Sequence, residues 1–146
     1  MIKVYDYAYY SLYRNTSIIN KSTPKWSTII ALSTLLSFNL ISLLIYSKFD
    51  VEKIGKNGFG AIPLILIGIN YVYFFAGKKH FNILNQFADL KYKLILDTIV
   101  LTYACISVFT FIFLLGIELK ITLYITGFVA LTAVFSFIFY RSRKSK

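Results

Sequence analysis

The stretch that decides the fold is WSTIIALSTLLSFNLISLLIY, residues 26–46. It contains no charged side chain and has the length of about 20 mostly apolar residues that a helix needs to cross a bilayer. Because backbone amides inside the bilayer must hydrogen-bond within their own segment, the crossing is expected to be helical. The apolar run is too long for a cleaved signal peptide, and no small-x-small site follows it, so we expect it to remain as a span.

Three further apolar stretches follow along the chain, at residues 59–76, 94–117 and 119–140. The composition agrees, because 58% hydrophobic and 15% charged residues lie outside the usage of soluble proteins. Short connections favour neighbouring antiparallel helices. The sequence therefore predicts one all-α domain over residues 1–146, an up-down four-helix transmembrane bundle with crossing angles of about 20°.

Lysine and arginine residues gather on one side of these predicted spans. Short cytoplasmic loops of membrane proteins carry an excess of these residues, which sets the orientation. The richer side contains Lys3, Arg14, Lys21, Lys25, Lys78, Lys79, Lys91, Lys93, Arg141, Arg143, Lys144 and Lys146. The other side contains Lys48, Lys53, Lys56 and Lys120, beside Asp50, Glu52 and Glu118. We therefore expect both termini in the cytoplasm, and the net charge of +10 needs no nucleic acid to explain it.

Residues 1–25 form a polar and aromatic tail, which we expect on the cytoplasmic surface. Within it, Tyr5, Tyr9 and Tyr13 fall on one face of a helix over residues 4–14. Tyrosine favours the headgroup layer because its ring packs on acyl chains while its hydroxyl stays hydrated. The pattern predicts a short interfacial helix anchored by these tyrosines, with Trp26 as a further anchor. An aromatic ligand platform or a partner-docking face is the alternative for the same rings.

Two connections carry patterns of their own. Between the second and third predicted spans, apolar residues recur at helical spacing over residues 81–92, which indicates an amphipathic extension of the third helix. The loop GKNGFG, residues 55–60, superficially resembles a phosphate-binding loop. It lacks the GxxxxGK[ST] pattern between a strand and a helix, so we expect a flexible turn there.

Few polar side chains lie within the predicted spans, and these are the candidate functional residues. Asn39 and Asn70 fall near mid-depth of the first two spans, and such amides typically hydrogen-bond across helices. Asp97 lies about one turn inside the third span, where Lys93 is one turn away and can neutralise it. Because ionisable groups in a bilayer are costly, a proton or cation site at Asp97 is the alternative. Serines of the first span suit either helix packing or a pore lining.

The sequence lacks the usual residues of a catalytic or metal centre. His80 is the only histidine and Cys105 the only cysteine, so one chain cannot supply a set of His and Cys metal ligands. A nucleophile elbow, an HExxH helix and paired carboxylates within one span are also missing. We therefore expect no enzyme, no metal and no cofactor.

Three segments carry a family resemblance: YYSLYR at residues 9–14, PKWS at residues 24–27 and the first span with Asn39. In this N-terminal third the chain resembles small four-span membrane proteins of unknown function from Bacteroidota. The resemblance implies a bacterial inner membrane and brings no activity with it. Four-span multidrug exporters are similar in size, but their pattern depends on a glutamate in the first helix, and residues 26–46 contain no acidic residue.

Three hypotheses for the function follow. The first is a non-enzymatic, membrane-anchored accessory protein whose basic inner face contacts anionic lipid headgroups. That face and the Tyr-rich tail would dock a membrane protein partner or a second copy of the chain. The second is an oligomeric pore, holin-like or effector-like, lined by the polar sides of several protomers. The third is a small ion- or proton-coupled transporter that uses Asp97.

Overall fold

The computed structural model describes residues 3–48, 55–75 and 78–144, without the side chains of residues 56, 57, 133 and 136–144. Its regular structure in these ranges is helical throughout, which confirms the predicted all-α class for them. The helices are α1 (Val4–Ile19), α2 (Pro24–Tyr46), α3 (Gly55–Phe75), α4 (Lys79–Phe87), α5 (Lys93–Leu114) and α6 (Leu119–Lys144). Outside the described residues lie Asp50, Glu52, Lys53, Ala76 and Lys146 and the side chains of Lys56, Arg141, Arg143 and Lys144.

Three helices are long and apolar enough to cross a membrane: Pro24–Tyr46 with 23 residues, Gly58–Phe75 with 18 and Lys93–Leu114 with 22. In the described part of α6, the apolar stretch Leu119–Thr132 is shorter. The predicted boundaries of the first and third spans agree with α2 and α5 to within a few residues. A membrane protein is therefore indicated by three helices, and the fourth predicted crossing rests on α6.

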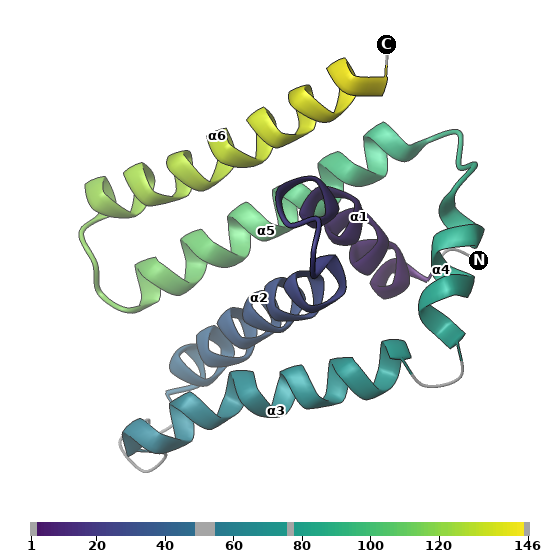
Figure 1. The fold of residues 1–146 in the computed structure, drawn as a ribbon. Helices are drawn as coiled ribbons and strands as arrows, with labels where there is room; N and C mark the ends of the chain where they lie inside the picture. The colour runs from purple at the N-terminus through teal and green to yellow at the C-terminus, as the bar shows by residue number, and fades with distance from the viewer. Residues whose placement is uncertain (1–2, 49–54, 76–77, 145–146) are drawn as a thin grey trace.

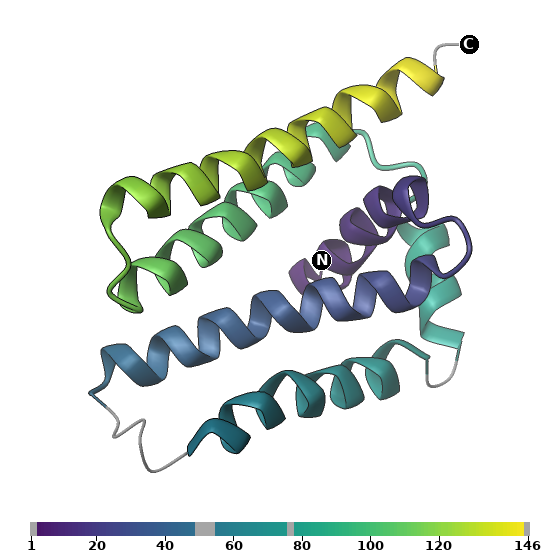
Figure 2. The ribbon, with the colours of Figure 1, turned by 60° about the vertical axis from the view of Figure 1, so that its left-hand side comes forward.

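The four long helices lie side by side in a row, in the spatial order α3, α2, α5, α6 (Figures 1 and 2). The hairpins α2–α3 and α5–α6 are each antiparallel, as short connections predict. The two hairpins meet through α2 and α5, which run in the same direction (Figure 2). This arrangement is more open than the expected up-down bundle, since α3 and α6 lie at opposite ends of the row, and α1 packs against α2, α5 and α6.

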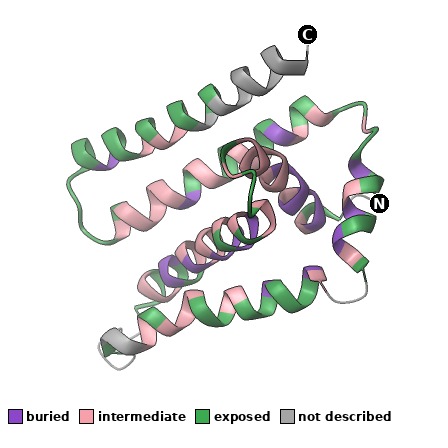
Figure 3. Cartoon of the chain, viewed as in Figure 1, coloured by how far each residue is buried: buried purple, intermediate pink, exposed green. Residues whose placement is uncertain are grey.

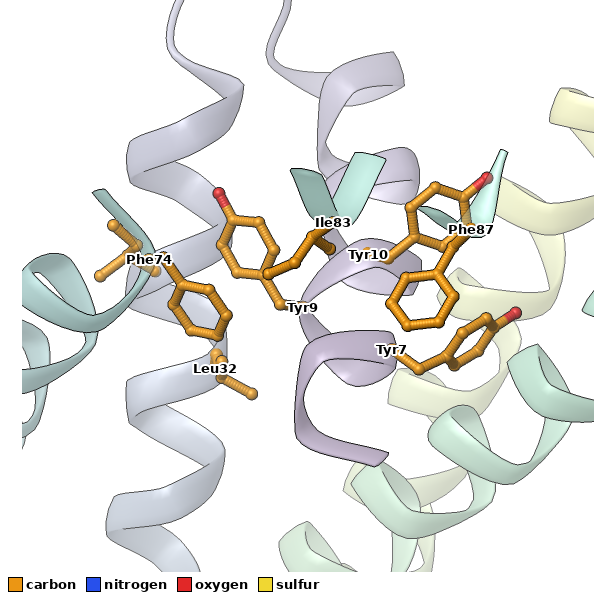
Figure 4. Close-up of a cluster of buried hydrophobic side chains, with 8 residues drawn as sticks. Tyr7, Tyr9, Tyr10, Leu32, Phe74, Ile83 and Phe87 are labelled. Carbon is orange, nitrogen blue, oxygen red and sulfur yellow. The ribbon is translucent and has the colours of Figure 1, made fainter. Parts of the chain in front are cut away.

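The N-terminal helix α1 is part of the core, and its aromatic side packs against other helices of the protein. Tyr7, Tyr9 and Tyr10 are only 2%, 0% and 8% exposed. They form one hydrophobic cluster with Ile29, Leu32, Phe74, Ile83 and Phe87 (Figure 4). Buried residues accordingly concentrate on α1, α2 and α4 (Figure 3). Helical periodicity identified an aromatic side of α1, but it could not distinguish a lipid environment from a protein one.

A polar turn reverses the chain between α1 and α2. The side-chain amide of Asn20 donates to Thr23 Oγ1 at 2.9 Å and to Ser27 Oγ at 2.8 Å, while Asn20 Oδ1 accepts from the backbone N–H of Thr23 at 3.2 Å. Pro24 then occupies the start of α2, where its missing N–H costs nothing and its fixed φ suits a helix. The turn is shorter than expected, because α1 continues to Ile19.

Two connections differ from their predictions. The segment after α3 forms a separate helix, α4, followed by a break, and does not extend α5. Its apolar residues Ile83 and Phe87 are buried in the α1 cluster, which explains why it packs there. The GKNGFG segment belongs to the first turns of α3, and only Gly55, with φ of +65°, has a turn conformation.

Candidate functional site

The candidate site is the seat of α1, meaning the surfaces of α2, α3, α4, α5 and α6 that surround this helix at one end of the molecule. Charged residues hold α1 there. The helix contains one acidic and one basic residue, Asp6 and Arg14. Arg14 pairs with Asp97 on α5, and Asp6 Oδ1 lies 3.5 Å from Lys79 Nζ on α4. Because the two pairs have opposite polarity along α1, they fix both its direction and its register.

Asp97 receives its hydrogen bonds from a single face of α1. Tyr7 Oη donates to Asp97 Oδ1 at 2.9 Å, and Ser11 Oγ donates to the same oxygen at 2.8 Å. Arg14 Nη2 donates to Asp97 Oδ2. Residues 7, 11 and 14 share one side of a helix, so α1 presents three donors together. The carboxylate is 6% exposed and its charge is compensated inside the protein.

The expected pairing of Asp97 with Lys93 is not observed. Lys93 Nζ instead donates to the backbone carbonyl of Ala88, where the α4–α5 connection begins. The four-residue spacing along one helix predicted Lys93 as the partner of Asp97. The observed partner is Arg14, which is 83 positions away in the sequence. Two signals in the sequence could have indicated the Arg14–Asp97 pair. Arg14 shares a helical face with Tyr7 and Ser11, and Asp97 is the only acidic residue in the predicted spans.

Asp6 has a second set of partners where α3 ends and α4 begins. Tyr73 Oη donates to Asp6 Oδ1 at 3.2 Å, and Lys79 Nζ lies 3.1 Å from the centroid of the Tyr73 ring. The ammonium therefore interacts with both a carboxylate and an aromatic face. Asp6 is 3% exposed. The contacts of Asp6 with Tyr73 and Lys79 stabilise the position of the first turn of α1, and the Arg14–Asp97 pair stabilises the position of its second half.

His80 is buried on α4 and contacts α1. Its Nδ1 lies 2.9 Å from Tyr9 Oη in a shared hydrogen bond, and only 2% of the residue is exposed. Burial lowers the pKa of His80, and the positive charge of Lys25 lowers this pKa further. Burial also raises the pKa of the Tyr9 phenol, so both groups are neutral near pH 7. Tyr9 also stacks on Phe74, with 3.9 Å between ring centroids.

Asn70 and Asn39 each connect different helices, and they do not contact each other. Asn70 Nδ2 donates to Ser33 Oγ at 2.8 Å, and Asn70 Oδ1 accepts from Tyr5 Oη, so this amide joins α1, α2 and α3. Burial of the phenol is the main cause that raises the pKa of Tyr5 to about 12, and the neighbouring Tyr73 is the second cause. Asn39 Nδ2 donates to Tyr103 Oη at 2.6 Å, which joins α2 to α5.

Of the four predicted interfacial anchors, Trp26 is the one with a large exposed fraction, 50%. Tyr9 is fully buried, and Tyr5 and Tyr13 are half-buried against α3 and α4. Trp26 stacks on Tyr71 with ring centroids 5.1 Å apart. Next to these rings, the structure has a pocket of about 130 Å³ that sequence reasoning missed, lined by Lys25, Trp26, Ile29, Tyr71 and Phe75.

Among the residues that the structure describes, no group of three or more His, Cys, Asp or Glu side chains is arranged to hold a metal ion. No family model, curated protein or solved structure matches the chain. The function therefore has to be inferred from the residues of this protein alone. Its distinctive chemistry is the pair of buried carboxylates, Asp6 and Asp97, each of which binds α1 to the rest of the molecule.

Proposed function

We propose that this chain is a four-span protein of a bacterial inner membrane with both termini in the cytoplasm, similar to the Bacteroidota proteins that its N-terminal third resembles. Helices α2, α3 and α5 have the length and apolarity to cross. As a fourth crossing, α6 has 26 residues, which rise ~39 Å. Large exposed apolar side chains on α6, such as Leu123, Phe128 and Leu131, suit a lipid environment and support this assignment.

The cytoplasmic end in this proposal is the end at which α1, α4 and the first residues of α2 and α5 meet. We call its accessible lysines Lys21, Lys78, Lys91 and Lys93 the basic inner face; the first three are exposed and Lys93 is half-exposed. Asp6 and Asp97 do not offset this charge at the surface, because both are buried and paired with internal partners. Among the described side chains at this end, Asp89 is the exposed acidic one.

The function that this geometry supports best is a non-enzymatic, membrane-anchored accessory protein that docks an acidic protein segment at the basic inner face, next to anionic lipid headgroups. The observation that carries the proposal is the burial of both Asp6 and Asp97 in the α1 seat, which leaves Asp89 as the one exposed acidic side chain described at the same end as these four lysines. Such a surface attracts negatively charged partners and increases their rate of encounter. The Tyr-rich face of α1 takes no part in docking in this proposal, because it is buried.

The test places a photo-crosslinking residue at the exposed Asn85 of α4 and measures crosslinked products in intact cells. We expect a discrete product whose yield falls when Lys21, Lys78, Lys91 and Lys93 are replaced by glutamine. The matched control replaces Lys48 and Lys120, exposed at the opposite end, and should leave the yield unchanged. An undiminished yield in the first variant, with the protein still in the membrane fraction, would refute docking at this face. A product of two copies of the chain would identify the partner as the protein itself.

Two other functions have less support from the geometry. A transporter would need Asp97 to exchange an ion or proton, whereas this carboxylate is held by Arg14, Tyr7 and Ser11. A pore would need polar side chains on the outside of the protomer, whereas Ser33 and Ser37 of α2 are buried. Release of dye from liposomes by the purified protein would support the pore instead.

A further inference from the structure

The pocket between α2 and α3 adjoins the seat of α1, with which it shares Ile29, but its other lining residues give it a chemistry of its own. It provides about 130 Å³ of space beside Lys25, Trp26, Ile29, Tyr71 and Phe75. Two of its lining rings, Trp26 and Tyr71, stack with an interplanar angle of 12° and are 50% and 44% exposed. The pocket is therefore reachable from outside the α2–α3 hairpin, while Ile29 and Phe75 make its deeper wall apolar.

The charge of the pocket selects an anion. Lys25 Nζ lies 5.6 Å from the centroid of the Phe75 ring and 5.1 Å from that of Phe81. Within the described parts of the chain, no carboxylate pairs with Lys25, since the ion pairs involve Arg14 and Lys79. Three aromatic side chains without a cation could hold a quaternary ammonium group. With an unpaired ammonium among them, a cationic ligand is repelled and an anionic one is attracted.

The size of the pocket excludes a whole metabolite. Sites for small molecules usually enclose about 300–1,000 Å³, and a cavity of about 150 Å³ holds a group the size of benzene. A space of about 130 Å³ thus accommodates one compact group of a larger molecule whose remainder lies outside. Lys25 and Trp26 belong to the first turn of α2, where the first candidate span begins, and this is the depth at which Trp and Tyr favour the headgroup layer.

We propose that this pocket binds the phosphate group of an anionic phospholipid. Lys25 pairs with the phosphate, and the indole N–H of Trp26 and the hydroxyl of Tyr71 are donors for the remaining headgroup oxygens. The acyl chains then lie along the exposed face of α3. Gly68 and Leu64 are on this face, three and seven positions before Tyr71, and extend it from the headgroup level into the bilayer. This inference rests on the proposed topology, which puts the first turn of α2 at the inner headgroup level. It adds that an anionic phospholipid binds next to the basic inner face.

The chain contains a single tryptophan, so the fluorescence of Trp26 reports on the pocket without any label. The full-length protein is reconstituted in nanodiscs with phospholipids brominated near the ester end of their acyl chains, because bromine quenches tryptophan on contact. We expect brominated phosphatidylglycerol to quench Trp26 more strongly than brominated phosphatidylcholine at the same mole fraction. Lys25→Gln should reduce the apparent preference for phosphatidylglycerol about fivefold, the effect of one lysine at an anionic surface.

Lys120→Gln is the matched control, since it removes an exposed lysine from the opposite end of the molecule, away from the basic inner face, and should leave the preference unchanged. Equal quenching of the native protein by both lipids, or a preference that survives Lys25→Gln, would overturn the lipid site while leaving the topology intact. Quenching by neither lipid would overturn both the site and the proposed depth of α2. Relief of quenching by millimolar glycerol 3-phosphate would overturn the lipid as occupant in favour of a free phosphate ester.

Discussion

At the scale of single residues, the ion pair between Arg14 and Asp97 dominates because both charges are largely buried. Their side chains are 13% and 6% exposed, and removing one partner leaves the other charged and poorly solvated. The asymmetry matters more than the attraction itself, since a buried pair can contribute little while a buried single charge is costly. The pair therefore acts chiefly on the choice of structure, by making other positions of α1 unfavourable.

We predict that Arg14→Ala lowers the free energy of unfolding by about 3–5 kcal/mol, the usual cost of breaking a buried pair. The free energy can be measured by titration of detergent-solubilised protein with SDS. The exchange of charges in Arg14→Asp with Asp97→Arg should restore part of the loss. Lys91→Ala, at an exposed site, serves as control and should change the free energy by at most about 0.5 kcal/mol. If Arg14→Ala behaves like Lys91→Ala, the pair does not hold α1 in place.

A second prediction concerns His80 and pH. The pKa of His80 is lowered on folding, so near pH 6.5 the unfolded chain binds a proton that the folded one does not. The stability contributed by neutral His80 is therefore present above its ordinary pKa and is lost as the pH falls below it. Lys25 faces the imidazole with a positive charge, and the Tyr9 hydroxyl and the rings of Tyr13, Phe75 and Phe81 surround it.

We expect the free energy of unfolding to decrease as the pH falls from about 7 to 5, and the decrease to be smaller in His80→Gln, which cannot be protonated. Parallel SDS titrations of both proteins across this range isolate the contribution of His80. Superimposable pH profiles would show that His80 is not the titrating group.

At the scale of elements, α1 shows what sequence periodicity can and cannot predict. The spacing of the tyrosines correctly placed a helix near residue 4, and the length of the apolar runs placed α2 and α5. The environment of α1 was missed, because aromatic rings with hydroxyl groups suit a headgroup layer and a protein interior equally well. The hydrogen-bond partners of Tyr5, Tyr7 and Tyr9 lie on α3, α5 and α4, and no local pattern reveals a contact between residues that are 65 or more positions apart.

Substitutions at Tyr9 test the buried position of α1. Tyr9→Ala removes a fully buried ring from its stack on Phe74 and should cost about 3–5 kcal/mol of unfolding free energy. Tyr9→Phe keeps the ring, loses the hydrogen bond to His80 and should cost about 1 kcal/mol. SDS titration provides both values. A helix that lay on the membrane surface would tolerate both changes alike, so similar small losses would contradict the burial of α1.

At the scale of the whole molecule, the candidate site was only partly predictable. Asn39, Asn70 and Asp97 were singled out because polar groups in apolar segments are rare and require partners. Their partners, Tyr103, Ser33 and Arg14, could not be chosen among many similar residues without the fold. The row of helices was also hidden, because loop lengths predict which helices are neighbours along the chain but not how two hairpins meet.

For the whole molecule, we predict on which side of the membrane each end lies, and the position of the C-terminus tests this prediction. If α6 crosses the membrane, a C-terminal tag and a cysteine at exposed Lys91 lie on the same, cytoplasmic side. In a Cys105→Ser background, Lys91→Cys should react with an impermeant maleimide only after spheroplasts are lysed, and the tag should resist added protease until then. Ser47→Cys, exposed at the opposite end, should react in intact spheroplasts. Digestion of the tag in intact spheroplasts would show that α6 does not bring the C-terminus to the cytoplasmic side and would refute the fourth crossing.

The long sequence separation between α1 and its partners bears on the order of events during synthesis. Helix α1 is synthesised well before the residues that it binds on α5, since Ser11 and Asp97 are 86 positions apart. Contacts between residues far apart in the sequence form late, because the entropy of loop closure has to be offset before they contribute. Residues 4–19 therefore have no native partner on α4 or α5 until the α2–α3 hairpin has been synthesised, and insertase or chaperone assistance at that stage would determine the yield of folded protein.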